Sequence, residues 1–379
     1  MENTICRNCG LEQEISNNFC ENCGSKLIDE VEESPRKTRT PVKKRRSGKL
    51  LLIIPIILLL LGAGYILPGI ISGGLDATGI RYSGTNRYST AYEIAKANDT
   101  KGDTVIIVQG RNDDGGFPVI DGLLASGLAG AKNAQILLTE SHALPQETLD
   151  ALEELGASTA IIVGGRAAVD DDVHISLERL GLNVHRISGV NRYDTALKVA
   201  RSMGSGKNNT AIIVNGDSEI DSLVAGPLAH KGYPILMVDN NRETVPDETK
   251  QAFEELNIDK VIIIGSRVVV SERIEEQLNA FGVEVEARYG GEDRIETSLL
   301  LAEHPELKNE NRITLINGWN YSDGVLASTL ESPIIYFNSN SGITEEIEEY
   351  IKNKRGFQVI GGTTVVSEGI FLALERLFE

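Results

Sequence analysis

The chain has 379 residues, of which 41% are hydrophobic, and a formal net charge of −18 at pH 7. This length suits two or three domains, and the hydrophobic content is ordinary for a globular protein. The excess of acidic residues argues against a nucleic-acid partner, because the field of the chain repels a polyanion. The charge is also uneven, since residues 1–72 hold 10 Lys and Arg against 8 Asp and Glu and the remainder carries −20.

All four cysteines lie within the first 23 residues, in two Cys-x-x-Cys-Gly motifs formed by Cys6, Cys9, Cys20 and Cys23. A two-residue gap lets one tight turn present two thiolates, and four thiolates complete the tetrahedral shell of Zn²⁺. About 30 residues cannot bury a useful core, so the metal would supply the folding free energy. We predict a structural zinc ribbon over residues 1–28, which resembles the short ribbons at the N-termini of many bacterial membrane proteins. Reduced cysteines on a disordered tail, or a redox pair, are the alternatives.

Residues 29–49 are rich in Glu, Lys, Arg, Ser and Pro, which predicts a flexible linker. No charged residue occurs from Leu50 to Leu75, and about 20 apolar residues suffice to span a bilayer. We therefore predict one transmembrane helix over 50–72, a cleaved signal peptide being the alternative. The basic run 43–46 precedes this stretch, which predicts a cytoplasmic N-terminus and extracellular residues beyond the span, next to the membrane.

From residue 81 onward, short apolar β-rich runs alternate with amphipathic helix-like runs. In the first copy the predicted strands are 104–108, 135–138 and 159–163, and the predicted helices are 120–131, 146–155 and 173–180. Continuous apolar strands separated by helices are typical of a parallel sheet covered on both faces. The order recurs twice, so the predicted fold class is α/β, with three tandem modules at 81–185, 186–287 and 288–379 after the zinc ribbon and the transmembrane helix.

Each repeat opens with two arginines at a constant spacing. The pairs are Arg81 and Arg87, Arg186 and Arg192, and Arg288 and Arg294. A guanidinium fork matches a carboxylate or a phosphate, so these six are our candidate polymer-binding residues. The alternative is an intramolecular Arg–Asp bridge that holds the loop to the sheet. The second arginine of each pair is expected just before a helix.

Small and polar residues recur where the predicted strands end. Gly110, Gly216 and Gly318 follow the first of these strands, and an aspartate stands at the head of the next helix in each repeat, at Asp121, Asp221 and Asp323. Ligands of such sheets bind at the carboxyl ends of the strands. Each aspartate has two readings, a helix N-cap or a ligand contact.

Several blocks recur in order in every copy, among them Arg186–Tyr193, Ile220–Ala229 and Val261–Gly265 in the second. With these blocks, residues 81–379 resemble the clostridial-type cell-wall-binding repeat. The resemblance implies non-covalent attachment to an anionic cell-envelope polymer by α/β modules packed as a pseudo-threefold trimer. A strand such as Ile136-Leu137-Leu138 is characteristic of these repeats.

The expected function is therefore that of a membrane-anchored surface protein of a Gram-positive envelope. Its outer repeats would bind anionic cell-wall polymer and its cytoplasmic zinc ribbon would contact a protein partner. An enzyme acting on envelope carbohydrate and a ligand-free self-association module are the alternatives. We predict no catalytic residues, because the five histidines do not recur at equivalent positions and no nucleophile–base pattern emerges.

Overall fold

The computed structural model describes residues 3–5, 12–14, 79–98, 102–111, 119–320 and 324–378. The chain divides into two compact units, Met1–Ile70 and Ile71–Glu379. In the first, strands β1 (Asn3–Ile5) and β2 (Glu12–Glu14) pair antiparallel. The four predicted zinc ligands, the linker 29–49 and the predicted span 50–72 lie outside the described residues. Within the ranges that are described, no helix is both long enough and apolar enough to cross a membrane.

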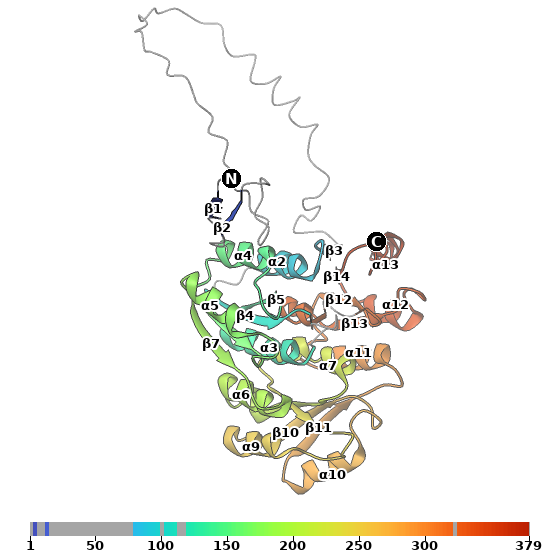
Figure 1. The fold of residues 1–379 in the computed structure, drawn as a ribbon. Coiled ribbons are helices and arrows are strands. Elements are labelled where there is room, and N and C mark those ends of the chain that lie inside the picture. Colours follow the sequence, from blue (N-terminus) through green and yellow to red (C-terminus); the bar gives the residue numbers. More distant parts are fainter. Residues whose placement is uncertain are drawn as a thin grey trace, which may run out of the picture. The chain divides into compact units, whose positions relative to one another are not determined.

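Module one contains a four-stranded parallel sheet in the order β5-β4-β6-β7 (Figure 1). Its strands are β4 (Thr104–Gln109), β5 (Gln135–Thr139), β6 (Thr159–Val163) and β7 (Asn183–Ile187). Its helices are α2 (Arg87–Ala97), α3 (Val119–Lys132), α4 (Gln146–Glu154) and α5 (Asp171–Arg179). The predicted strands and helices of the first repeat are confirmed, and β7 is an additional strand.

Alternate residues of each central strand enter two different cores, as expected when both faces of a sheet are covered. Ile106 and Val108 of β4 join a large core that the three modules share. Val105 and Ile107 face the other way, into a local core that includes Leu152 of α4 and residues of α5. The predicted α/β sandwich is thus confirmed for module one, and the other two modules have local cores of the same kind.

Module two repeats this order with the sheet β9-β8-β10-β11. Its strands are β8 (Thr210–Asn215), β9 (Ile235–Val238), β10 (Lys260–Ile264) and β11 (Glu284–Tyr289). Its helices are α6 (Arg192–Met203), α7 (Glu219–Leu223), α8 (Gly226–His230), α9 (Asp247–Leu256) and α10 (Glu272–Ala280). A short 3₁₀ turn, η2 (Lys207–Asn209), precedes β8.

Module three has the sheet β13-β12-β14-β3, and its last strand comes from the opposite end of the repeat region. Its own strands are β12 (Arg312–Asn317), β13 (Ile334–Phe337) and β14 (Gly356–Ile360). Its helices are α11 (Arg294–Ala302), the 3₁₀ helix η3 (Gly324–Leu330), α12 (Glu345–Ile351) and α13 (Glu368–Leu377). The fourth strand is β3 (Gly79–Tyr82), which pairs parallel with β14 from Phe357 to Ile360.

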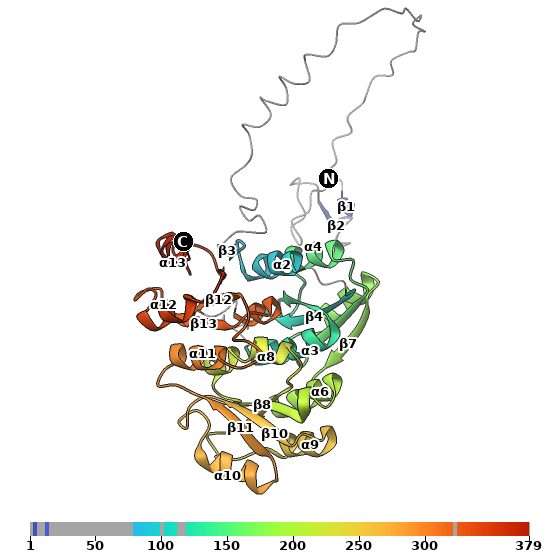
Figure 2. The ribbon, with the colours of Figure 1, turned by 180° about the vertical axis from the view of Figure 1, so that it is seen from behind.

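Strand β3 therefore closes the three modules into a ring. In Figures 1 and 2 this strand, blue in the sequence colouring, lies beside the red elements of module three. Strands β7 and β11 occupy the same edge position in the sheets of modules one and two. Each of them, unlike β3, directly follows the rest of its module in the sequence. Each sequence repeat thus opens with the last strand of the preceding module, and the first repeat opens with the last strand of module three.

The shared core is built around three equivalent segments, α3, the α7–α8 pair and η3, which contact one another pairwise. They approach closely because small residues lie at the crossings. A Cβ atom added to Gly122 would lie 2.6 Å from a methyl carbon of Val325, and one added to Gly130 would lie 1.8 Å from the carbonyl oxygen of His230. Each segment also packs on the first helix of the next module, α3 on α6, α7 on α11 and η3 on α2. These contacts lead from module one to module two, from two to three, and from three back to one.

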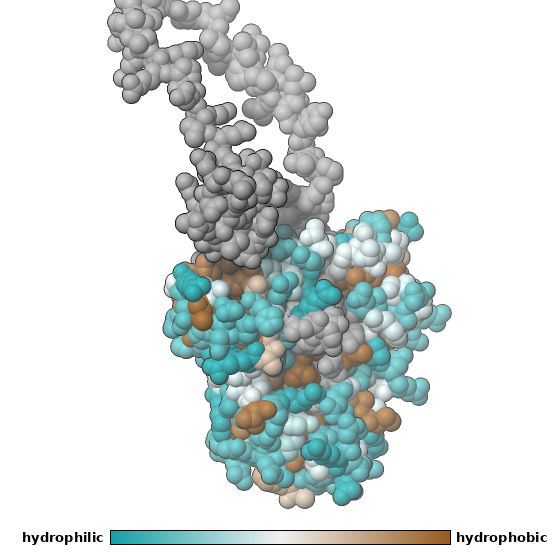
Figure 3. Space-filling view, viewed as in Figure 1, coloured by the Kyte–Doolittle hydropathy of each residue, from teal (hydrophilic) through white to brown (hydrophobic). Residues whose placement is uncertain are grey.

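The described surface is mainly polar. On the face shown in Figure 3, hydrophobic residues form separate small spots in a hydrophilic surface. Three exposed apolar side chains lie at loops next to the repeat openings or strand ends. They are Val190, Val268 and Trp319.

Candidate functional site

The two arginines that open each repeat are separated by the same number of residues in all three copies, and the structure explains this spacing. The residue before the second arginine caps the following helix. Asn86 Oδ1 accepts from Ser89 N at 2.9 Å, Asn191 Oδ1 from Asp194 N at 2.8 Å, and Asp293 Oδ1 from Glu296 N at 2.9 Å. Such caps satisfy helix N–H groups that have no partner within the helix. The helices accordingly begin at Arg87, Arg192 and Arg294, so each second arginine is the first residue of its helix and not, as predicted, the residue before it.

The first arginine of each pair lies on the edge strand and donates to the backbone of its own module. Arg186 donates to Gly164 O at 3.0 Å and Asp170 O at 3.2 Å. Arg288 contacts Gly265 O at 2.9 Å, Val270 O at 3.0 Å and Glu275 at 2.8 Å. Arg81 does the same in module three, with Gly361 O and Val366 O, which again places β3 there.

These three guanidinium groups therefore fasten the glycine turn after β6, β10 or β14 to the neighbouring strand. Burial lowers the pKa of Arg81 and Arg186. Their donors serve backbone carbonyls, and two of them also pair with a carboxylate, Arg288 with Glu275 and Arg81 with Glu368. The structure assigns them a positioning role in the fold.

Removing the Arg288 side chain is expected to lower the free energy of unfolding by about 2 kcal/mol, because two carbonyl oxygens and Glu275 lose a charged donor. The control is Arg267→Ala in the same module, where an exposed pair with Glu272 at 3.7 Å should contribute at most about 0.5 kcal/mol. Urea unfolding followed by circular dichroism compares the two. Equal midpoints for Arg288→Ala and Arg267→Ala would contradict the positioning role.

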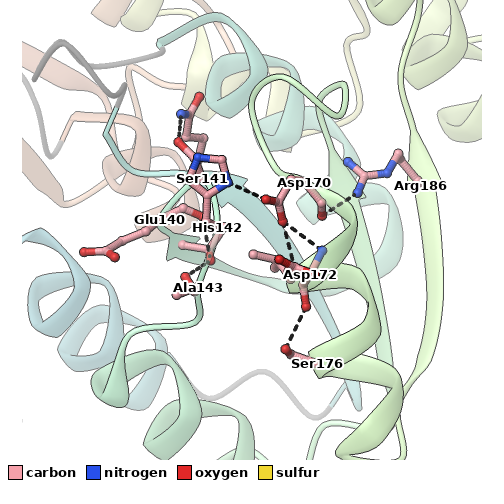
Figure 4. A network of polar contacts seen from close by, with 11 residues as sticks. Glu140, Ser141, His142, Ala143, Asp170, Asp172, Ser176 and Arg186 are labelled. Carbon is pink, nitrogen blue, oxygen red and sulfur yellow. Dashed lines mark hydrogen bonds and ion pairs between the residues drawn. The ribbon is translucent and has the colours of Figure 1, made fainter. Parts of the chain in front are cut away.

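A polar network at the start of α5 extends the contacts of Arg186 (Figure 4). Asp170 caps α5 by accepting from Asp172 N at 2.8 Å and Val173 N at 3.3 Å, and its carboxylate also pairs with His142 Nδ1. The bond to His142, followed by the two backbone N–H groups, lowers the pKa of Asp170 below its ordinary value. The network is therefore a helix cap tied to the loop after β5.

Asp170→Ala is expected to cost about 1 kcal/mol at neutral pH, because the cap is lost. A carboxyl group with a lowered pKa stabilises the fold above the pKa of the unfolded chain, and this contribution disappears as the pH falls through the folded value. The difference between Asp170→Ala and the native chain should therefore shrink on acidification. Ser271→Ala is the control, because Ser271 precedes α10, makes no cap bond and has a buried hydroxyl without a partner in the described part of the chain. Denaturation midpoints measured across pH test both, and a pH-independent cost of Asp170→Ala would contradict the expectation.

The second arginine of each pair lies at the start of a helix and donates to the carbonyl oxygen of the glycine that ends the first strand. Arg87 contacts Gly110, Arg192 contacts Gly216, and Arg294 contacts Gly318 at 2.5 Å. One donor of each guanidinium is thereby fixed, and the group stands at the carboxyl ends of the strands. This is the edge at which ligands of parallel sheets bind.

The residue after that glycine differs in each repeat and changes the surroundings of the second arginine. In module two, Asp217 accepts from Arg192 at 3.0 Å and neutralises it. In module three, the guanidinium carbon of Arg294 lies 4.7 Å from the ring centroid of Trp319, a cation–π contact, and Trp319 is 50% exposed. In module one the residue is Arg111, which is exposed.

A cavity of about 380 Å³ lies where module three meets the start of α2. Module one contributes Arg87, Tyr88, Arg111 and Glu140 to its wall, and module three contributes Asn320 and Gly362. We call it the 3–1 cavity. A second cavity, of about 340 Å³, lies at the start of α6 and has an acidic wall, with Asp239, Asp247 and Glu248 against Arg242.

Two of the three recurrent aspartates, Asp121 and Asp221, lie inside their helices and are not N-caps. Asp121 is the third residue of α3, and a Cβ added to Gly164 would lie 2.6 Å from its carboxylate oxygen, so it faces the glycine turn after β6. Burial raises the pKa of Asp121, and nearby Arg192 offsets this in part. Asp221 lies inside α7 and accepts from Ser218 Oγ at 2.8 Å, whereas Asp323 lies outside the described residues.

Comparison with known proteins identifies the repeats. The family described as Cell wall binding domain 2 (CWB2) matches residues 81–174, 186–275 and 288–371. The chain belongs to this family. Its three CWB2 matches begin at the first residue of the three predicted repeats, so the predicted resemblance is confirmed for that part of the chain.

Two curated relatives from Bacillus subtilis (strain 168) are similar to this chain. N-acetylmuramoyl-L-alanine amidase LytC is 31% identical over 293 residues, which is 76% of this chain and 56% of the relative. Amidase enhancer is 30% identical over 303 residues, or 78% of this chain and 40% of that protein. The chain thus spans about half the length of these relatives.

Two solved structures share the CWB2 fold. Cwp8 from Clostridium difficile aligns with a TM-score of 0.67 at 21% identity, covering 86% of this chain and 54% of Cwp8. Cwp6 from the same organism aligns with a TM-score of 0.69 at 22% identity, covering 80% and 48%. At this identity the likeness establishes the fold alone.

Proposed function

We propose that this protein is a surface protein of a Gram-positive envelope whose three CWB2 modules bind an anionic cell-wall polymer non-covalently. The observation that carries the proposal is the presence of three CWB2 matches in a chain whose three modules close into one ring. Repeated modules on one rigid body give several contacts to a repeating polymer, and linked weak contacts raise the overall affinity.

The acidic character of the modules limits where an anionic polymer is held. Residues 73–379 carry an excess of 20 negative charges, so binding requires local groups that overcome this field. Arg81, Arg186 and Arg288 are engaged with backbone carbonyls. Arg87, Arg192 and Arg294 stand at the ligand-binding edge of their sheets and are the better candidates among the six arginines.

The N-terminal part of the chain is proposed to anchor the modules. The apolar run 50–72 would span the membrane, and the basic residues before it would keep the N-terminus in the cytoplasm. Cys6, Cys9, Cys20 and Cys23 would hold one structural Zn²⁺, whose role is to stabilise a small fold. The β1–β2 hairpin supports this reading, because Cys6 and Cys9 fall between its paired strands in the sequence. The ribbon would contact a cytoplasmic protein.

The proposal is one of binding rather than catalysis. LytC carries the name of an amidase, but the similarity covers 56% of that protein. The five histidines of this chain occupy unrelated places: His142 follows β5, His174 is in α5, His185 is in β7, His230 ends α8 and His304 follows α11. Such positions do not build a repeated catalytic site.

Retention on purified sacculi tests the binding role. The full chain, solubilised in detergent, should cosediment with sacculi at low salt and be released as the salt concentration rises, because the contacts involve charge. Sacculi stripped of their anionic polymers should retain little of it. A chain that remains in the supernatant with intact sacculi at low salt would overturn the proposal, and polymer turnover by the purified chain would favour the enzymatic alternative.

Topology and metal content are tested separately. Protease added to intact cells should digest residues 81–379 and spare residues 1–49, and the opposite pattern would refute the proposed orientation. Elemental analysis of the purified chain should find one zinc per molecule, lost on Cys6→Ser with Cys9→Ser. A metal-free native chain would refute the ribbon without affecting the wall-binding proposal.

A further inference from the structure

Two histidines are buried where modules two and three meet. His304, which follows α11 of module three, is 7% exposed, and its ring centroid lies 5.9 Å from that of Tyr233 and 5.8 Å from that of Tyr289, both in module two. His230 ends α8 of module two with a side chain that is 10% exposed, and its Nε2 lies 3.4 Å from Oε1 of Glu331, which follows η3 of module three. Both imidazoles therefore belong to a junction between modules.

The surroundings of His304 require its neutral form. Its Nδ1 accepts a hydrogen bond from Glu306 N at 3.2 Å, and an imidazolium, which carries a proton on both nitrogens, could not accept that bond. Burial lowers the pKa of His304, and the carboxylates of Glu306 and Glu286 offset only part of this shift. The cation of Lys207 lowers it as well. Protonation would break the bond to Glu306 N and place a charge between the two tyrosine rings.

His230 lies where all three modules approach one another. Helix α8 packs on η3 of module three and on α3 of module one, whose Gly130 lies against the carbonyl oxygen of His230. Burial lowers the pKa of His230 and nearby Lys231 lowers it too, while Glu331 and the backbone of Ser126 offset the shift in part. Because the Glu331 side chain is 62% exposed, water screens its charge, and it compensates poorly for the desolvation of an imidazolium.

The fixed charges around these histidines join the same two modules. Lys207 pairs with Glu306 at 2.8 Å, and Lys231 pairs with Glu310 at 2.7 Å. The bond to Lys207 is the main cause that lowers the pKa of Glu306, so this carboxylate takes up a proton at a lower pH than an ordinary glutamate. Histidine is the side chain that ordinarily changes its charge between about pH 5 and pH 8, so mild acid acts on this junction through the imidazoles.

We propose that His230 and His304 form a proton-sensitive joint between modules two and three, closed while both rings are neutral and opened when they take up protons. Opening leaves module three attached to module one through the pairing of β3 with β14, and to module two through residues 290–293. The ring then becomes a hinged chain of modules. The joint needs no ligand, so the inference is independent of wall binding.

The direction of the pH dependence follows from the lowered pKa of both histidines. A histidine that is released from the junction binds a proton more readily than the buried one, so acid favours the open form. The closed form has its full stability above about pH 6.5, the ordinary histidine value, and loses stability as the pH falls below it. The carboxylate of Glu306 adds a loss of its own only at a lower pH, because its pKa is lowered from the ordinary glutamate value.

Hydrogen exchange of the full chain, solubilised in detergent without any polymer, tests the joint. Protection factors, which correct for the intrinsic pH dependence of exchange, are compared at about pH 7.5 and about pH 5, on either side of the ordinary histidine pKa. Helices α8 and α11 report on the junction, and β4 of module one is the internal reference. In the native chain, acid should lower the protection of α8 and α11 about tenfold or more relative to β4, because two rings gain protons on opening.

A double variant and a matched control identify the groups that respond. His304→Asn keeps an acceptor for Glu306 N, His230→Gln keeps a donor for Glu331, and neither new side chain titrates. The double variant should lose most of the effect of acid on α8 and α11. His185→Gln alters an exposed histidine of β7 and should respond as the native chain does. His230→Lys supplies a lasting cation and should lower the protection of α8 and α11 already at about pH 7.5.

The outcomes separate a local joint from general acid sensitivity. A loss of protection confined to the junction in the native chain and in His185→Gln, and reduced in the double variant, supports the joint. An equal loss in β4, or an undiminished loss in the double variant, overturns it. If the double variant is poorly folded at neutral pH, His230→Lys decides, and native protection of its α8 and α11 overturns the inference. A chain that sacculi do not retain leaves this inference untouched, since none of these measurements involves the wall.

Discussion

Alanine at Gly130 is expected to destabilise the ring by about 3 kcal/mol, near the upper end of the usual cost of overpacking. Its Cβ would lie 1.8 Å from the carbonyl oxygen of His230, and the obstacle is backbone, which cannot rotate away as a side chain can. Helices α3 and α8 would have to separate, and part of the core shared by the modules would be lost.

Gly165→Ala is the matched control, because a Cβ there meets no atom within 4 Å and the backbone does not have a positive φ. Both substitutions add one methyl group to module one. Urea unfolding should show a lower midpoint for Gly130→Ala and a native midpoint for Gly165→Ala. Similar midpoints for the two would mean that the contact between α3 and α8 contributes little to the ring.

Replacing Gly79–Tyr82 by Gly-Ser-Gly-Ser is expected to lower the stability of module three by about 5 kcal/mol. The change removes the hydrogen bonds of Arg81 with Gly361 O and Val366 O, each contributing about 1 kcal/mol. It also weakens the ladder with β14, because Gly and Ser form strands poorly. It further removes the side chain of Tyr82, which packs against the core that the modules share. Hydrogen exchange should show faster exchange in β12, β13 and β14 than in the strands of module one.

A transplanted strand gives the decisive comparison. Strand β7 begins four residues after α5 ends, and β11 begins four residues after α10 ends. The sequence Gly-Ile-Arg-Tyr, appended after Glu379 through one linking residue, would follow α13 at the same spacing. This addition should restore protection to module three in the Gly-Ser variant. Protection that stays low with the appended strand would show that β3 acts through its connection to α2 rather than through its pairing.

The sequence predicts the buried strands well, because their apolar runs are continuous. The edge strands β3, β7 and β11 are missing from the prediction, since polar residues alternate along them, as in Asn183-Val184-His185-Arg186-Ile187. A half-exposed strand of this kind has no continuous apolar run, so the apolar pattern does not predict it as a strand. The first arginines were consequently assigned to a loop, whereas they lie on these strands and hold the glycine turns.

The three central segments differ in secondary structure, although they occupy equivalent places. Segment α3 is one helix, α7 and α8 are two short helices, and η3 is a 3₁₀ helix. Repeat two has Pro227, which lacks a donor and stands at the start of α8, so its helix is interrupted after α7. Repeat three has a shorter segment before Pro333, and its segment forms the 3₁₀ helix η3. The recurring order of strands and helices predicts a helix at this place in each copy.

The candidate site could be predicted only in part. The second arginines were found from their spacing, and the structure places each of them at the first residue of a helix. The residue after the strand-end glycine differs in every copy, being Arg111, Asp217 or Trp319. This difference between otherwise similar repeats is a signal in the sequence that could have pointed to the site. The 3–1 cavity could not be predicted, because its walls come from opposite ends of the repeat region.

The differing residues at these three positions have a consequence for how a long ligand is oriented. Three identical copies around a ring would accept a repeating chain in three equivalent registers, with no preferred starting point. Here one position offers an additional cation, the next a carboxylate, and the third an aromatic face. A polymer that distinguishes these surfaces has a single register and a defined direction across the protein, so a triplicated fold can impose polarity on what it holds.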